Sequence, residues 1–421
     1  MNIVSGTRGL SRFLWQEATK MGLSPSAARL AGVCRILLVS AVAGCLLGTA
    51  SAATLKVGPG EKFARPSAAF QAARDGDVIE INAAGVYGGD VGTIRANRLI
   101  VRGVGRGRVK LPAQGHNAGG KAIWVIAGND VTVENIEFSG ARVPDRNGAG
   151  LRPEGKNLTV RNCRFYDCEN GILGGAGEIL IEYCAFDHCG PVANPATHSL
   201  YISDRCSRLI FRYNYSTFTL EGHLLKTRAK ESWVLYNRLT DELGRGSAVA
   251  DFPNGGLVVL VGNILHKGAH SQNNRVIAYG MEGIKHQRNA LYVVNNTMLY
   301  ENRHPSPSWF VRVEKAPADF TAVVRNNLCI GNIPLRNSPR VDAAGNVLVK
   351  TAAAAGVVDA ARYDFHLVAG SPCIDAGVAA GRLPGFDLTP KLQYVHPCRK
   401  EPRPVVGRLD AGAFEYTPPG R

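Results

Sequence analysis

Nine times along this chain a short apolar strand ends at an asparagine, or at a tyrosine in its place, and the chain then turns. The nine units run from VTVEN at 131–135 to AAGN at 343–346 and end at Asn135, Asn162, Tyr183, Tyr213, Asn237, Asn263, Asn296, Asn327 and Asn346. From the first to the last is 346 − 135 = 211 residues in eight steps, a mean of about 26. A strand-and-turn unit recurring at this spacing is typical of repeat architectures, in which each unit buries its apolar face only against its neighbours.

The repeated unit is a strand, because it is rich in Val, Ile, Tyr and Phe at period two and is interrupted by Gly and Asn. Blades of a propeller are longer than these intervals. The pattern therefore predicts an all-β fold, a parallel β-helix. Asparagine suits the turns because it tolerates left-handed backbone and can hydrogen-bond the asparagine of the next coil.

The repeats divide the chain into four segments. We expect an N-terminal extension with a signal peptide at 1–52 and an N-terminal cap at 53–90, with a short helix from Pro66 to Arg74. The coils are predicted at 91–350, and 351–421 is predicted to be a C-terminal cover. Caps are expected because an open end coil would expose its apolar interior and an unpaired strand edge.

The first segment predicts export. Ile36 to Leu47 is an apolar run that follows Arg29 and Arg35 and precedes Ala50-Ser51-Ala52, the pattern of a secretory signal cleaved near Ala52. The run is too short for a membrane span. We therefore expect a secreted or periplasmic protein. The alternative is a lipoprotein anchored at Cys45, because Val42-Ala43-Gly44-Cys45 resembles a lipoprotein box.

The net charge suggests an anionic partner. It is +15 for the whole chain, and the first 53 residues hold five basic and one acidic residue, which leaves +15 − 4 = +11. Nucleic acid is a poor candidate, since the basic residues are dispersed and no nucleic-acid motif occurs. We expect an acidic polysaccharide as partner and a monomeric protein. The alternative is that the charge serves only solubility.

Four cysteines support the repeat register. Cys163 and Cys184 occupy one column and Cys168 and Cys189 a second, each pair 21 residues apart. We interpret them as small buried side chains stacked inside the coils, with disulfides between adjacent coils as the alternative. Near the C-terminus, Cys373 and Cys398 flank a loop rich in Pro and Gly, where we predict a disulfide.

A second column of strands lies between the turns. Its eight members begin with AIWVIAG at 122–128 and end with WFVRVEK at 309–315. The first three are apolar or rich in glycine, whereas later ones carry ionisable groups on adjacent coils: His198, Tyr201, His223, Lys226, Arg228, Asp251 and Glu282. This change of composition predicts the functional site. Strand alternation places Lys226 and Arg228 on one face and His223 on the other unless a bulge intervenes.

At this point the chain resembles secreted right-handed parallel β-helix proteins of the pectate-lyase-like superfamily. The resemblance is carried by GDVIEINAAGVY at 76–87, by the Asn turns, and by SPCIDAG at 371–377 with DAGAFEY at 410–416. EGHLLKT at 221–227, followed by a YN turn, GS and GN, looks like the coils of the alginate lyase and chondroitinase B family. That resemblance implies that Lys226 is a base. In that family an Arg follows one coil later, but here the equivalent position falls at or next to Asp251, so that Arg is absent.

Cleavage of a uronate polymer by β-elimination needs a group that neutralises the carboxylate, a base for the C5 proton and an acid at the leaving oxygen. We assign Lys226 as base, Arg228 as neutraliser, and Tyr201, His223 or His198 as acid. Asp251, Asn254 and Glu282 are predicted to contact substrate. Hydrolysis by two of Asp204, Asp251 and Glu282, C5-epimerisation, and a protein that only binds polysaccharide remain alternatives. No metal site is predicted, although calcium occurs in some relatives.

Overall fold

The structure is a computed structural model that describes residues 52–190 and 197–419. The predicted signal peptide and Cys45 lie outside the described residues. The chain divides at Ser51 into two units, and the second, from Ala52, holds the elements below. Within the described residues, no helix is long and apolar enough to cross a membrane.

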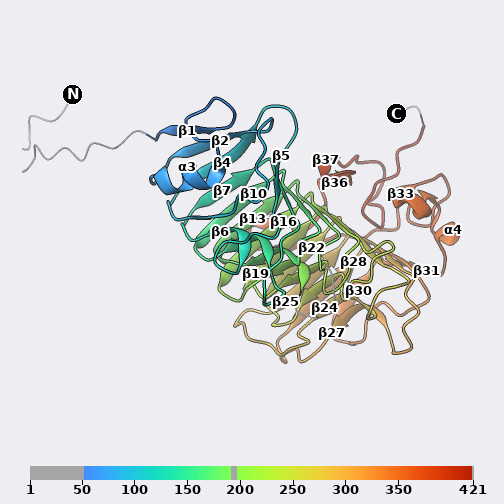
Figure 1. Ribbon diagram of the computed structural model, residues 1–421. Helices are drawn as coiled ribbons and strands as arrows, with labels where there is room; N and C mark the ends of the chain where they lie inside the picture. The colour runs from blue at the N-terminus through green and yellow to red at the C-terminus, as the bar shows by residue number, and fades with distance from the viewer. Residues whose placement is uncertain (1–51, 191–196, 420–421) are drawn as a thin grey trace, which may run out of the picture. The chain divides into compact units, whose positions relative to one another are not determined.

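Three parallel sheets make up most of the second unit, here named A, B and C (Figure 1). Sheet A contains β1 (Thr54–Val57), β2 (Val78–Asn82), β4 (Ile100–Val104), β7 (Val131–Glu134), β10 (Lys156–Arg161), β13 (Ala176–Glu182), β16 (Cys206–Arg212), β19 (Glu231–Leu235), β22 (Leu257–Val261), β25 (Ala290–Val294), β28 (Thr321–Arg325) and β30 (Val341–Ala344). Sheet B contains β3 (Gly92–Ile94), β6 (Ala122–Ile126), β9 (Ala149–Pro153), β12 (Asn170–Gly174), β15 (His198–Ile202), β18 (Leu225–Thr227), β21 (Ala250–Phe252), β24 (Arg275–Tyr279) and β27 (Trp309–Val313). Sheet C contains β5 (Val109–Pro112), β8 (Ile136–Ser139), β11 (Arg164–Tyr166), β14 (Ala185–Asp187), β17 (Tyr215–Thr217), β20 (Arg238–Thr240), β23 (Ile264–Lys267), β26 (Thr297–Tyr300), β29 (Leu328–Ile330) and β31 (Val347–Val349).

Along the chain one strand of sheet A is followed by one of sheet C and one of sheet B, and each strand pairs in parallel with its equivalent one coil away. This is a parallel β-helix, as the repeats predicted. All eight strands of the predicted second column lie in sheet B. The interior is filled by alternate side chains, including a stack of Phe138, Phe165 and Phe186 with ring centroids 5.3 and 4.9 Å apart.

The recurrent turn between sheets A and C consists of two adjacent columns rather than one. The first column has left-handed backbone at Asn135, Asn162, Tyr183, Tyr213, Tyr236, Gly262, Asn295, Asn326 and Gly345. The next residue forms a hydrogen-bonded ladder through Asn214, Asn237, Asn263, Asn296, Asn327 and Asn346. The predicted asparagine stacking is therefore confirmed, but in the later coils it belongs to the residue after the left-handed one.

The cysteine columns are confirmed as stacked thiols. Cys163, Cys168, Cys184 and Cys189 are free and buried, which excludes disulfides between them. Cys184 also begins the asparagine ladder, because its backbone N–H donates to Asn214 Oδ1 at 2.9 Å.

The predicted disulfide between Cys373 and Cys398 is wrong, since both thiols are free. Cys398 Sγ donates to the carbonyl oxygen of Cys184, the residue before β14, at 3.2 Å. Cys373 packs in a cluster with the β29 residues Leu328 and Ile330. Strands β14 and β29 are five steps apart in sheet C, or roughly 24 Å at the usual strand spacing, so the two sulfurs are too far apart to bond.

The ends of the unit are covered by different means. At the N-terminal end, α3 (Pro66–Ala72) begins at a proline and buries Phe70 against Trp124 of β6, with ring centroids 5.0 Å apart. Beyond β31 the elements are α4 (Ala352–Ala355), β32 (Val357–Asp359), η1 (Ala360–Arg362), β33 (Asp364–Leu367), β34 (Arg382–Leu383), β35 (Phe386–Asp387), β36 (Leu392–Val395) and β37 (Arg399–Pro402).

The segment from 351 onward packs on outward-facing side chains of sheets A and C. Its residues Phe365 and Phe414 join a cluster with Ile264, Leu299 and Leu328 of sheet C. Ala380, Leu383 and Leu388 join a second cluster with Val259 and Val261 of sheet A. The C-terminal cover therefore occupies two of the three sheets in the later coils. The ionisable groups predicted to form the site lie on the third, sheet B.

Candidate active site

A polar column runs across three neighbouring strands on the outer face of sheet B. Tyr201 of β15 pairs in register with Lys226 of β18, and Lys226 pairs with Asp251 of β21. Parallel strands in register lie about 4.8 Å apart, so equivalent side chains on successive coils are close neighbours. The residues on either side of Lys226, Leu225 and Thr227, point inward and are buried. The sequence-predicted column therefore exists.

Three residues that follow the sheet B strands close over this column. Arg228 donates from Nε to Tyr201 Oη at 2.9 Å, from Nη1 to Asn254 Oδ1 at 2.5 Å and from Nη2 to Glu282 Oε2 at 2.5 Å. The Tyr201 ring also lies 5.8 Å from the guanidinium carbon. Arg228 is thus held from three sides, which fixes its orientation.

Glu282 bridges the two cations of the cluster. Its Oε1 accepts from Lys226 Nζ at 2.8 Å, while Oε2 accepts from Arg228. Partial burial raises the pKa of the Glu282 carboxyl, but the hydrogen bonds and charges of Lys226 and Arg228 outweigh it and lower the pKa to about 2. Lys226 and Arg228 therefore form a fork that binds a carboxylate, and in this structure the carboxylate is the protein's own.

The exposure of the side chains in the cluster decreases from Glu282 toward Asp251. The Glu282 side chain is 44% exposed, against 12% for Lys226, 15% for Arg228 and 3% for Asp251. Asp251 Oδ2 lies 3.9 Å from Lys226 Nζ and 3.3 Å from His223 Nε2. A molecule arriving from solvent meets Glu282 first, and Asp251 forms the floor.

The two histidines lie next to this floor. The His223 Nδ1 accepts from the Ala248 backbone N–H at 2.9 Å, which assigns the ring proton to Nε2, facing Asp251. His198 Nδ1 accepts the backbone N–H of His223 at 3.1 Å, and the two rings stack with centroids 4.9 Å apart. Burial lowers the pKa of both imidazoles, although Asp251 partly offsets this effect at His223. Both nitrogens of His223 are engaged, so it is suited to positioning Asp251 rather than to donating a proton to substrate.

The expected separation of His223 from Lys226 by strand alternation is wrong. Leu224 and Leu225 are consecutive yet both fully buried, so the in-out alternation slips by one residue before β18 begins. The slip brings His223 to the same side as Lys226 and lets both side chains reach Asp251. All eight residues predicted for the site consequently belong to one connected cluster.

Calcium does not fit this cluster. Asp251 Oδ1 is buried and has no hydrogen-bond partner among the described residues, but Lys226, with its Nζ 3.9 Å from Oδ2, lies beside the same carboxylate. Calcium needs several oxygen ligands, and three of the four carboxylate oxygens of Asp251 and Glu282 already lie beside a Lys, Arg or His nitrogen. In the described parts of the chain, no group of three or more His, Cys, Asp or Glu side chains is placed to hold a metal ion.

Two contributions were missed by the sequence interpretation. His286, beyond Glu282 in the chain, donates from Nε2 to the Arg228 carbonyl oxygen at 3.0 Å and so supports the turn that carries the guanidinium. Lys267 of β23 is fully buried, donates from Nζ to the Gly246 carbonyl oxygen at 3.1 Å, and also bonds the Ser247 carbonyl oxygen. Burial lowers the pKa of Lys267 to about 7. Both residues lie outside the sheet B column, so the repeat gave no signal for them.

Comparison with known proteins agrees with this architecture. A family model described as a right-handed β-helix region matches residues 113–299. No curated protein matches the chain. The crystal structure of the pectate lyase Pel9A is similar, with a TM-score of 0.57 and 14% identity over 88% of this chain and 98% of that one. An alginate lyase from Paenibacillus sp. str. FPU-7 gives a TM-score of 0.45 and 14% identity, covering 71% of this chain and 98% of its own. The chain therefore has a right-handed, pectate-lyase-like β-helix fold, and at this identity the likeness extends to the fold alone.

Proposed function

We propose that this protein is a polysaccharide lyase that cleaves a uronate-containing polymer by β-elimination at the sheet B cluster. One observation carries the proposal: Lys226 and Arg228 hold the carboxylate of Glu282 between Nζ and Nη2. A uronate carboxylate has the same charge and the same pair of acceptor oxygens, so it can replace Glu282 in this fork. The likeness of the fold to a pectate lyase supports the same conclusion.

Each step of elimination has a group in reach of this fork. Arg228 binds the uronate carboxylate and stabilises the negative charge that develops when C5 loses its proton. When the uronate replaces Glu282, the Lys226 ammonium gives one proton to solvent, and the neutral amine then takes the C5 proton at Nζ. The Tyr201 hydroxyl, which accepts from Arg228 Nε at 2.9 Å, gives its proton to the leaving glycosidic oxygen. The C4–O bond breaks, and a C4–C5 double bond forms at the new non-reducing end.

Hydrolysis has less support in the same geometry. A glycoside hydrolase needs a carboxylic acid whose pKa is raised so that it can protonate the leaving oxygen. The pKa of Glu282 is instead lowered to about 2. Asp251, the other carboxylate of the cluster, is almost fully buried beneath Lys226. The pair of carboxyl groups that hydrolysis requires is therefore not presented to a polymer.

The test is to incubate the purified protein with pectate, alginate, chondroitin and dermatan. Elimination produces an unsaturated uronate that absorbs at about 232 nm, whereas hydrolysis does not. We expect absorbance to rise with at least one polymer. New reducing ends without absorbance would instead assign hydrolysis. Polymer binding with neither signal would indicate a binding protein, and a change in uronate configuration alone would indicate an epimerase. We further propose that the protein acts outside the cytoplasm, on the basis of its predicted signal peptide.

A further inference from the structure

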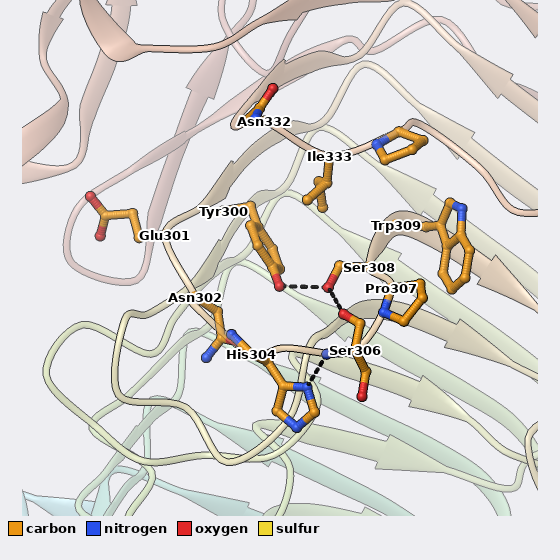
Figure 2. Close-up of a pocket in the computed structure, with 11 residues that line it drawn as sticks. Tyr300, Glu301, Asn302, His304, Ser306, Pro307, Ser308, Trp309, Asn332 and Ile333 are labelled. Carbon is orange, nitrogen blue, oxygen red and sulfur yellow. Dashed lines mark hydrogen bonds between the residues drawn. The ribbon is translucent and has the colours of Figure 1, made fainter.

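A pocket separate from the cluster lies at the junction between β26 and β27 (Figure 2). It has a volume of about 450 Å³, and its walls are Tyr300, Glu301, Asn302, His304, 306–308, Trp309 and 332–334. This volume is in the range of small-molecule sites. We propose that the pocket binds a neutral pyranose unit of the substrate polymer, through stacking on Trp309.

The position of the pocket connects it to the candidate active site. In sheet B, Asp251 pairs with Ala278, and Ala278 pairs with Arg312 of β27. Arg312 is therefore two strands, or about 10 Å, beyond Asp251 in the same column. Its guanidinium carbon lies 5.4 Å from the centre of the Trp309 ring. The pocket thus adjoins the column that carries Lys226, at the distance of a few sugar units.

The walls of the pocket are suited to a sugar ring. Trp309 is half-buried, so part of the indole remains accessible for the apolar C–H face of a pyranose. On the other walls the polar groups are held in place: Tyr300 Oη and Ser308 Oγ are 2.8 Å apart, and His304 Nδ1 accepts the backbone N–H of Ser306 at 3.2 Å. Figure 2 shows Tyr300, Ser308, Ser306 and His304 to the left of and below Trp309. The remaining His304 nitrogen and the exposed Asn332 amide can bond hydroxyl groups.

Charge distinguishes this pocket from the Lys226–Arg228 fork. The residues that line it include no Lys or Arg, and their one carboxylate is Glu301. The Arg312 guanidinium beside Trp309 is already paired with Glu314 Oε1 at 2.9 Å. Glu301 Oε2 accepts from His266 Nε2 at 2.9 Å, and this hydrogen bond lowers the pKa of the Glu301 carboxyl. An ionised Glu301 repels a uronate but accepts a hydrogen bond from a sugar hydroxyl. The pocket therefore selects a neutral unit.

The inference rests on the proposed function in one respect: a single polymer occupies both the Lys226–Arg228 fork and the pocket at Trp309. Such a polymer carries a uronate at Lys226 and Arg228 and a neutral hexose a few units away. This excludes a pure polyuronate as the best substrate and favours a mixed polysaccharide.

The experiment is calorimetric titration of the full chain with soluble neutral gluco-, manno- and galacto-oligosaccharides and with oligouronates. We expect at least one neutral series to bind and W309A to weaken its affinity about tenfold, the size expected for loss of one aromatic platform. W309F, which keeps an aromatic ring, should lose less. W233F removes a tryptophan that packs on Phe386, away from the pocket, and should bind like the wild type.

The inference is overturned if no neutral series binds, or if W309A and W309F bind it as well as the wild type. It is also overturned if W309A weakens oligouronate binding as much as neutral binding. These outcomes are independent of the absorbance assay. A protein without lyase activity whose neutral-sugar binding depends on Trp309 would contradict the proposed function and leave this site in place.

Discussion

In the proposed function, Glu282 occupies the position that the substrate carboxylate takes, so binding of a uronate requires its displacement. It is the most exposed member of the cluster, and it sits in a turn after β24 whereas Lys226 lies in β18. Its removal therefore frees both cations without altering a sheet strand. The fork is neutralised at rest and becomes available when a competing carboxylate arrives.

We predict that E282Q binds oligouronates more tightly than the wild type, by about three- to tenfold, because two cations lose an anionic competitor. Calorimetric titration with an oligouronate measures the change. D204N is the matched control, since Asp204 is an exposed carboxylate in the neighbouring coil, and it should bind as the wild type does. Weaker binding by E282Q would show that Glu282 contacts the substrate instead of competing with it.

The buried histidines make the site sensitive to acid. Burial is the largest cause that lowers the pKa of His198 well below 6.5, and His223, Lys226 and Arg228 lower it further. As pH falls below 6.5 the unfolded chain takes up protons before the folded protein does, so the free energy of unfolding decreases. In H198N the amide oxygen can still accept the His223 N–H, but it does not titrate.

We therefore predict that the free energy of unfolding falls between about pH 7.5 and about pH 5.5, and that it falls further for the wild type than for H198N. Denaturant unfolding at the two pH values measures this difference. His223 has a lowered pKa as well, so H198N should retain part of the loss. An equal loss in both proteins would mean that His198 has the same pKa folded and unfolded.

For single residues, the sequence predicted which side chains lie close together but not the direction in which each side chain points. Register placed Lys226, Asp251 and Tyr201 together, because equal steps along a stacked strand lead to neighbouring side chains. Strand alternation failed at His223, because it cannot anticipate that both Leu224 and Leu225 turn inward. His223 precedes β18, so the alternation within that strand does not extend to it.

On the scale of elements, two ladders join successive strands. A charge ladder follows the outer face of sheet A, where Glu182 of β13 pairs with Arg161 of β10 at 2.5 Å and with Arg212 of β16 at 2.6 Å. Glu182 is buried while its partners are partly exposed. We predict that E182Q lowers the free energy of unfolding by about 2 kcal/mol, because the buried Glu182 carboxylate, which pairs with two partly exposed arginines, loses its charge.

Denaturant unfolding also provides the control for this ladder. Glu178 pairs with Arg208 but is 66% exposed, so E178Q should change stability by less than about 0.5 kcal/mol. If E182Q were as stable as E178Q, the charge ladder would be a surface feature without a role in holding β10, β13 and β16 together.

The asparagine ladder joins sheets A and C at the turns. Asn263 donates from Nδ2 to Asn296 Oδ1 and to the Val234 carbonyl oxygen, both at 2.8 Å, and accepts from Asn237 at 2.9 Å. We predict that N263A lowers the free energy of unfolding by about 3 kcal/mol, because it leaves buried partners unsatisfied. N129A, at an exposed asparagine, should cost no more than about 1 kcal/mol. A cost for N263A no larger than that of N129A would contradict the ladder's role.

The sequence predicted the asparagine recurrence but merged two positions. Left-handed backbone and ladder bonding fall on neighbouring residues, such as Asn295 and Asn296. In some coils both turn positions are asparagine, and in others the left-handed position is glycine or tyrosine. Residue type alone therefore does not show which position is left-handed and which forms the ladder. Only backbone geometry assigns the two roles.

At the scale of the whole molecule, the C-terminal segment decides which sheet faces solvent. Its residues pack on sheets A and C in the later coils, while the site column of sheet B stays accessible at Glu282. The sequence identified 351–421 as a cover but placed Cys373 and Cys398 together, because proximity along the chain was taken for proximity in space. The pocket at Trp309 was not predicted either, since its walls come from two separate segments, within 300–309 and 332–334, most of which lie between the repeated strands.

The central claim is that coil stacking turns Lys226, Arg228 and their neighbours into one reaction centre for uronate elimination. The most direct measurement is the rate of absorbance increase at about 232 nm for K226M, on the polymer that the wild type cleaves fastest. The matched control is K230M, which removes an exposed lysine four residues along the same segment. We expect a rate at least about a hundredfold lower for K226M and an unchanged rate for K230M. A K226M protein that cleaves as fast as the wild type would contradict the role of Lys226 as base.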